Sequence, residues 1–268
     1  MLVDLSIPYE IRTQSDSEQL VRYALDTETL KKEAEEIMKA HGLRAVENIF
    51  WKVANSDPHA ALSFDRLHAF HSGLWGYHFW SEMKAILEDM GREAQAQVEK
   101  QLDLMPRWRG LYHFGSALKV EFTDGSKYED LSKQALVATL FCAVFAATAL
   151  LCCIRSYLCV DMYASLEVHT EDTLAAGERE ADLLSILLME YAALCEVQGV
   201  LPLKDWNFPK SHSYKHIFED IRAKGVTRNY NTKPNEKMHG IIKMIYKLLT
   251  NFREIAPQVQ ITIFMLQR

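Results

Sequence analysis

Two acid–histidine pairs with the same spacing are the features of this 268-residue chain most suited to chemistry. Asp65 precedes His68 in the run DRLH, and Glu236 precedes His239 in the run NEKMH. Residues three apart on a helix lie one turn apart on the same face, so each pair places a carboxylate beside an imidazole. A carboxylate and an imidazole can both bind a divalent cation, so Asp65 and His68 are candidate ligands, and Glu236 and His239 repeat their pattern.

Each pair also has a structural interpretation. Asp65, His68 and His71 could bind zinc together, but positions three apart drift around a helix by about 60° per step. A histidine hydrogen-bonded within an aromatic core is therefore the stronger interpretation from spacing. Glu236 lies near the expected start of a helix, where an acid complements the helix dipole.

Several catalytic motifs are absent from the chain. It has no GxxxxGK[ST] loop, no GxGxxG turn and no GxSxG elbow, which removes support for nucleotide binding and serine hydrolysis. His212 and His216 stand four apart in HSYKH, but Ser213 occupies the position where a zinc protease needs Glu. This pair is interpreted as surface or core histidine.

Cysteine usage and the N-terminal sequence predict a chain that is not secreted. The cysteines are odd in number and form no CxxC pair, which argues against a disulfide framework and a structural zinc site. They are Cys142, Cys152, Cys153, Cys159 and Cys195. The N-terminus lacks a basic start followed by an apolar segment, so it does not resemble a secretory signal.

The net charge of -6 conceals a basic segment. Residues 204–253 hold 11 Lys or Arg and 4 Asp or Glu, a balance of +7, whereas the rest of the chain holds 19 and 32, a balance of -13. Such a segment predicts a local anion site, for example for a phosphate backbone, or else a solvated surface of mixed charge.

Apolar residues recur at helical spacing through most of the chain, which predicts a mainly α fold with one or two short strands at most. An extended piece is expected at 119–123, and the end, 258–266, is expected to be a strand or a frayed tail. The predicted helices are 17–25, 27–41, 44–55, 63–90, 93–104, 170–198, 211–224 and 235–251.

Residues 135–154 carry no charge and are long enough to span a membrane. The stretch is rich in Ala, Thr and Cys and continues into amphipathic sequence on both sides. A buried core helix is therefore favoured over a membrane span.

Three runs together resemble Plavaka-type transposases, DNA transposon proteins of mushroom-forming fungi. They are SDPHAALSFDRLHAFHSGLWGYHFW, RSYLCVDMYASLEVHTEDTLAAGE and DWNFPKSHSYKHIFEDIRAKGVTRNYNTKPNEKMHG, at 56–80, 155–178 and 205–240. The resemblance covers most of residues 42–257. It implies the helical part of a ribonuclease H-like DDE transposase, in which three acids hold two Mg²⁺ or Mn²⁺ ions that cleave and join DNA strands.

The resemblance also implies roles for individual residues. Asp65 would be the second catalytic, metal-binding acid and Glu236 the third, with His68 and His239 beside them. Three cations would contact the DNA backbone without reading its sequence. They are Arg228, Lys233 and Lys237.

The first acid of the family lies on an early strand, upstream of the region that begins to match at Gly42. Asp4 is present, but its surroundings do not resemble that motif. We therefore expect a single domain, 1–268, that lacks the N-terminal catalytic strands and has no strand-transfer activity. The alternatives are a non-catalytic helical DNA-binding or interaction protein, and a membrane-associated protein. A DNA substrate would imply that the protein is located in the nucleus. The alternative location is the cytoplasm.

Overall fold

The computed structural model describes residues 12–26, 30–119, 125–140, 145–199, 206 and 208–266. These residues form two compact units that divide between Ser63 and Phe64. Helices make up both units, and no strand occurs among the described residues, which confirms the mainly α prediction. Asp4 and most of the extended piece expected at 119–123 lie outside the described residues.

The N-terminal unit consists of α1 (Gln14–Leu25), α2 (Lys31–Ala40), the 3-10 turn η1 (Ile49–Lys52) and α3 (Pro58–Ala61). α1 and α2 pack through Val21, Ala34 and Met38. The helix predicted at 44–55 is wrong, because only η1 forms there. Val46, Ile49, Phe50 and Val53 remain more than half exposed, and a short helix is marginal without a surface that buries its apolar face.

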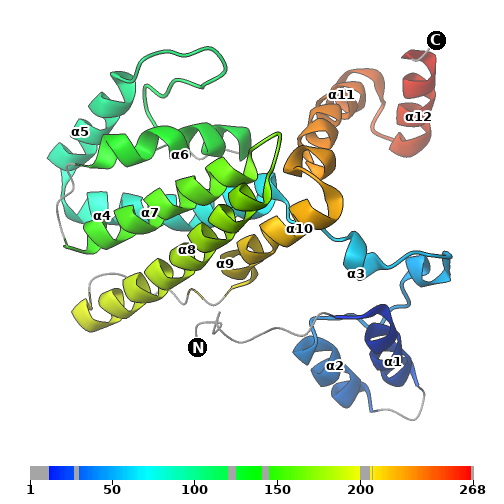
Figure 1. Ribbon diagram of the computed structural model, residues 1–268. Helices are drawn as coiled ribbons and strands as arrows, with labels where there is room; N and C mark the ends of the chain where they lie inside the picture. The colour runs from blue at the N-terminus through cyan, green and yellow to red at the C-terminus, as the bar shows by residue number, and fades with distance from the viewer. Residues whose placement is uncertain are drawn as a thin grey trace. The chain divides into compact units, whose positions relative to one another are not determined.

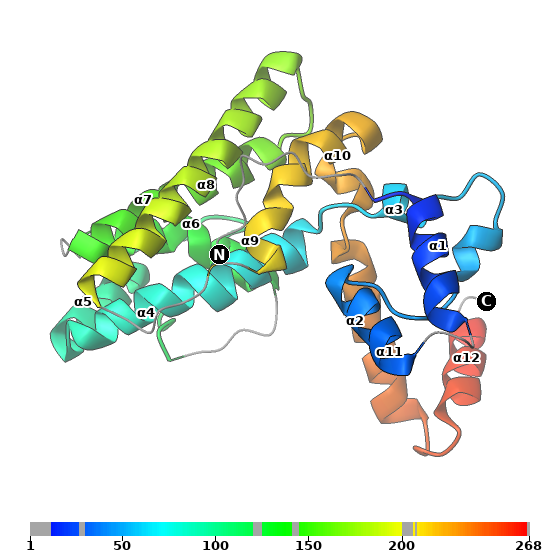
Figure 2. The same cartoon turned by 90° about the horizontal axis from the view of Figure 1, so that it is seen from below.

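The larger unit is built on a continuous helical run formed by η2 (Arg66–Phe79) and α4 (Trp80–Asp89). This run carries Trp75 and Trp80, which are fully buried and stack at 5.8 Å between ring centroids. α5 (Arg92–Asp103) and α6 (Gly125–Thr139) follow, and then α7 (Phe145–Ala164) and α8 (Glu171–Gln198). α7 and α8 lie side by side along most of their length (Figures 1 and 2).

The segment η2 is a π-helix over 14 residues, an unusual length for this wide form. Asp65 caps its start, because Asp65 Oδ1 accepts hydrogen bonds from the backbone N–H groups of Leu67 and His68. A Cβ added at Gly76 would lie 2.9 Å from the ring of Tyr128, so glycine is what lets α6 approach η2 closely. That approach brings Glu129 of α6 toward the side chains of η2.

The prediction of one core helix through 135–154 is wrong in its bounds, because α6 ends at Thr139 and α7 begins at Phe145. Residues 141–144 lie outside the described residues. Within α7, the window Ala147–Ala164 is apolar enough to cross a membrane, with a mean hydropathy of 1.3, but 56% of it is buried in the protein. That burial favours the core-helix interpretation.

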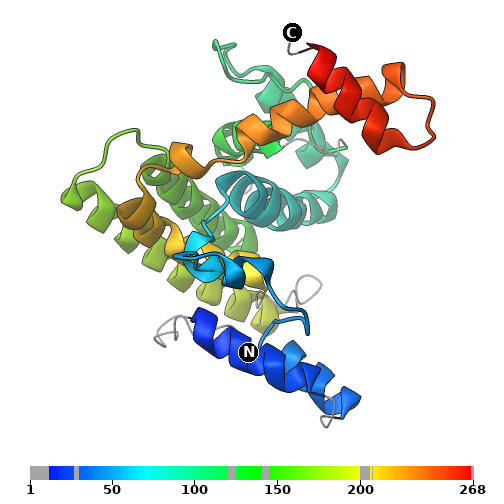
Figure 3. The ribbon, with the colours of Figure 1, turned by 90° about the vertical axis from the view of Figure 1, so that its right-hand side faces the viewer.

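The C-terminal part of the larger unit starts with α9 (Pro209–Ser213), the 3-10 turn η3 (Tyr214–His216) and α10 (Ile217–Lys224). The 3-10 turn η4 (Thr227–Tyr230) leads into α11 (Lys233–Leu249), which pairs with α12 (Ile255–Leu266) as a helical hairpin (Figure 3). The strand or frayed tail expected at 258–266 is therefore wrong. Residues 258–263 do alternate between polar and apolar, but the segment packs as a helix against α11, and this tertiary contact overrides the local pattern.

Candidate functional site

Asp65 lies at the junction of two helix starts that are far apart in the sequence. Besides capping η2, its carboxylate contacts His68, with 2.5 Å between Asp65 Oδ2 and His68 Nδ1. Thr232 Oγ1 donates a hydrogen bond of 3.1 Å to Asp65 Oδ1 and lies 3.4 Å from His68 Nδ1. The residues expected to form one acid–histidine pair are thus in contact, and Thr232 joins them.

Thr232 immediately precedes α11, the helix that carries the second acid–histidine pair. Glu236 is four residues further on, about 6 Å along the helix axis at a rise of about 1.5 Å per residue. The backbone that carries Glu236 therefore lies near Asp65, although 171 positions separate them in the sequence. The side chains of Glu236 and Lys237 lie outside the described residues, and His239 is exposed on α11.

A buried ion-pair cluster lies next to this junction, and its centre is Arg66. The guanidinium of Arg66 binds Asp161 of α7 in a bidentate manner, with Nε–Oδ1 at 2.7 Å and Nη2–Oδ2 at 2.9 Å. The side chain of Asp161 is only 5% exposed. Arg66 also reaches Glu129 of α6, with Nη2–Oε1 at 3.4 Å. Arg66 thereby links η2, α6 and α7.

Glu129 receives two further cations. Lys133 Nζ lies 3.1 Å from Oε1, and the ammonium of Lys233, the first residue of α11, forms an ion pair with Oε2. Burial raises the pKa of the Glu129 carboxyl, but the charges of His71, Lys233 and Arg66 oppose it and hold that pKa well below its usual range. Glu129 is therefore an ionised anchor for the start of α11.

His71 completes the cluster from the interior of η2. Its imidazole is fully buried, its Nδ1 is 2.9 Å from the hydroxyl of Tyr157, and its Nε2 is 3.4 Å from Asp161 Oδ1. Burial is the largest influence and lowers the pKa of His71 to about 4, despite the opposing charge of Asp161. The ring is therefore neutral at neutral pH.

His71, Glu129 and Asp161 offer ligand atoms within 4.8 Å of one another, a spacing that suits a metal ion. The charges around them do not suit one. Arg66, Lys133 and Lys233 already neutralise the two carboxylates, and all four carboxylate oxygens accept from a cation. A divalent cation would have to displace these ion pairs. We interpret the cluster as a structural network that fixes α11 against η2 and α7.

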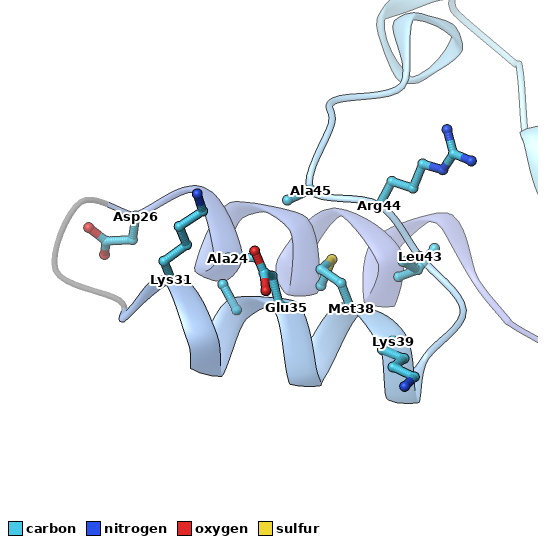
Figure 4. A pocket seen from close by; sticks show the side chains of 10 residues that line it. Ala24, Asp26, Lys31, Glu35, Met38, Lys39, Leu43, Arg44 and Ala45 are labelled. Atoms are coloured by element: carbon cyan, nitrogen blue, oxygen red, sulfur yellow. The ribbon is translucent and has the colours of Figure 1, made fainter.

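Each of the two units has a hollow of more than 500 Å³. One, of about 570 Å³, opens beside the ion-pair cluster and is lined by Arg66, Glu129, Lys133, Asp161 and Ser165. The other, of about 670 Å³, belongs to the N-terminal unit, where Lys31, Glu35 and Lys39 on α2 line it together with the segment 43–45 (Figure 4). The second hollow is open, its charges are mixed, and it groups no catalytic residues.

The cations expected near DNA differ in their surroundings. The side chain of Arg228 is 77% exposed and its Nη1 lies 3.3 Å from Glu167, an open pair at the surface. Lys233 is 29% exposed and is held by Glu129. Arg228 is thus available to an external anion, whereas Lys233 already has a partner within the protein.

Sequence reasoning missed Arg66, Glu129 and Asp161. One signal was present for Asp161, which is the only charged residue of the run SYLCVDMYAS within the apolar α7. A lone acid in such a run requires a buried cation. The sequence does not show that Arg66 supplies this charge.

No family model, curated protein sequence or solved structure matches this chain.

Proposed function

We propose that this chain is part of a DNA transposase of the DDE type, in which Asp65 and Glu236 bind a divalent cation beside DNA. The observation that carries the proposal is the hydrogen bond between Thr232 and Asp65. It joins Asp65 of the DRLH segment to Thr232, which lies three residues before the NEKMH segment, and these are the two motifs for which the resemblance implies a shared metal.

The surroundings of Asp65 suit an oxygen ligand for Mg²⁺ or Mn²⁺. Its side chain is 26% exposed, so a cation can reach it from solvent. Oδ2 has His68 as its partner rather than a lysine or arginine ammonium or guanidinium group. When bound, the cation would supply Lewis-acid stabilisation of phosphate oxygens. Asp65 and Glu236 would hold it, and His68 and His239 would border the site.

The proposal also predicts that the chain by itself does not transfer DNA strands. A two-metal site needs clustered carboxylates to offset the charge of both ions. Glu129 and Asp161, the carboxylates next to Arg66, are already neutralised by arginine and lysine. Asp65 and Glu236 by themselves favour one weakly held cation.

Mn²⁺ binding tests the site directly. Calorimetry on the purified chain should give one site, which Asp65→Asn and Glu236→Gln each weaken by about tenfold or more. Glu254→Gln, an exposed acid beyond α11, is the matched control and should leave binding unchanged. Equal Mn²⁺ affinity in the wild type and Asp65→Asn would refute the metal site.

A plasmid assay tests the proposed inactivity separately. Supercoiled DNA incubated with the chain and Mn²⁺ should stay intact. Metal-dependent nicking that Asp65→Asn abolishes would overturn the inactivity and leave the metal site standing.

A non-catalytic helical DNA-binding protein is the second candidate, and the balance of +7 over residues 204–253 favours it. Binding to a short duplex should then fall steeply as salt rises. No binding even at low salt would remove this candidate and the role of the basic residues.

A further inference from the structure

His212 and His216 direct the same ring nitrogen toward one another. His212 lies in α9 and His216 at the end of η3, one helical turn later. Their Nε2 atoms are 3.2 Å apart, and the two rings are inclined at 71°. The two rings thus converge on one point between them.

This separation matches the geometry of a tetrahedral metal site. Zinc binds imidazole nitrogen at about 2.0–2.1 Å, so two such nitrogens at a tetrahedral angle lie about 3.3 Å apart. Histidines four apart on one helix face are the arrangement that zinc enzymes use for two of their ligands. That arrangement needs no particular residue at Ser213, because the glutamate found there in proteases is a base and binds no metal.

Glu219 places a carboxylate near one of the two rings. Its Oε2 lies 3.6 Å from His216 Nδ1, on the opposite side of the ring from His212. A carboxylate there favours the proton on Nδ1, which leaves the Nε2 lone pair directed toward His212. Metal-binding histidines commonly have a carboxylate partner of this kind, which fixes the tautomer and the ring orientation.

The backbone between the two histidines is held in place. Tyr214 is fully buried, and its hydroxyl lies 2.8 Å from Ser185 of α8. Ser211 Oγ donates to the carbonyl of Trp206 at 2.6 Å. A ligand pair on a rigid segment binds metal with a smaller ordering cost.

The pair is also accessible to solvent, because both histidines are half-buried and the side chain of His216 is 33% exposed. We propose that His212 and His216 bind a borderline divalent transition metal, Zn²⁺ in the first instance, through their Nε2 atoms. Water fills the remaining positions, as in sites that keep coordination positions open. This site is independent of the cation proposed for Asp65 and Glu236.

The test is calorimetric titration of the full chain with Zn²⁺ in the Asp65→Asn background, which removes the other proposed site. One Zn²⁺ should bind per chain. His212→Ala and His216→Ala should each weaken binding by more than the roughly 10–100-fold that loss of an orienting partner costs. Glu219→Gln should weaken it less. Mg²⁺ should not compete, because it prefers oxygen ligands.

His113→Ala is the matched control, since that imidazole pairs with Asp103 at 3.2 Å and has no second histidine beside it. Unchanged Zn²⁺ affinity in both His212→Ala and His216→Ala would overturn the proposal. X-ray absorption of the Zn²⁺-loaded wild type supplies a readout that needs no variant. Two imidazole nitrogens at about 2.0 Å would support the site, and fewer than two would refute it.

Discussion

Two aspartates border Arg66, and the protein uses them in opposite ways. Asp161 is almost completely buried, and both of its oxygens bind the guanidinium of Arg66. Asp65 precedes Arg66 in the chain, is 26% exposed, and binds a helix start, His68 and Thr232. A buried carboxylate with its charge neutralised serves the fold. A carboxylate that caps a helix and remains open to solvent keeps the capacity to bind a cation.

The largest expected difference between the two aspartates is in stability. Asp161→Asn leaves the buried guanidinium of Arg66 without its main counter-charge, so we expect a loss of about 3–5 kcal/mol in the free energy of unfolding. Asp65→Asn keeps the cap, because Asn caps helices as well as Asp does, and should cost less than about 0.5 kcal/mol. Urea denaturation measures both. Similar losses in the two variants would remove the distinction.

The buried cluster around Asp161 also includes His71, whose titration should make the stability of the protein depend on pH. Its pKa in the folded protein, about 4, lies below the unfolded value of 6.5, so the unfolded chain takes up the proton first as pH falls. Stability is complete above about pH 6.5 and decreases toward pH 4, by up to about 3 kcal/mol. The charged or titratable groups facing the ring are Arg66, Glu129, Tyr157, Asp161 and Lys233.

His71→Gln provides the control for this pH dependence. It removes the titrating group. The slope of the unfolding free energy against pH between pH 4 and 6.5 should therefore correspond to up to one proton fewer than in the wild type. The pKa values of His169 and His212 are also lowered, by burial first, and their contribution should persist in the variant. An identical slope in both proteins would show that His71 is not the group responsible.

A smaller effect on stability distinguishes the capping role of Asp65 from the role of its negative charge. Asp65→Ala removes the acceptor for Leu67 N–H and His68 N–H and should cost about 1 kcal/mol, whereas Asp65→Asn should not. Both variants should lose Mn²⁺ binding. If Asp65→Asn bound Mn²⁺ as the wild type does, the open aspartate would be a cap and nothing more.

The smallest expected effect concerns Arg228, the exposed cation. Arg228→Gln should weaken binding to duplex DNA regardless of sequence and reduce the salt slope by about 1. Arg22→Gln, an exposed arginine in an i,i+4 pair with Glu18 in the N-terminal unit, is the control. Equal salt slopes for Arg228→Gln and the wild type would exclude a phosphate contact at Arg228.

The helices were predictable where the sequence alone determines them. Thr170 caps α8, and Gly199 ends it with a φ of 61°, as turn and cap chemistry predicts. The break between α6 and α7 was not predictable, because the apolar pattern continues through it. The pairing of Asp65 with the start of α11 rested on resemblance, since 167 positions separate Asp65 from Thr232. The partners of Asp161 depend on packing across three helices, which periodicity does not encode.

The attachment of α11 at its first turn has a mechanical consequence. Thr232 and Lys233 fix that end at two carboxylates, while Leu248 and Leu249 near the other end are exposed. The helix has 17 residues and is about 25 Å long, so a tilt about its attached end displaces each residue in proportion to its distance from that end. A tilt of about 10° moves the far end by about 4 Å but the backbone of Glu236 by only about 1 Å. A change in the tilt of α11 would therefore displace its outer end several times further than the backbone of Glu236.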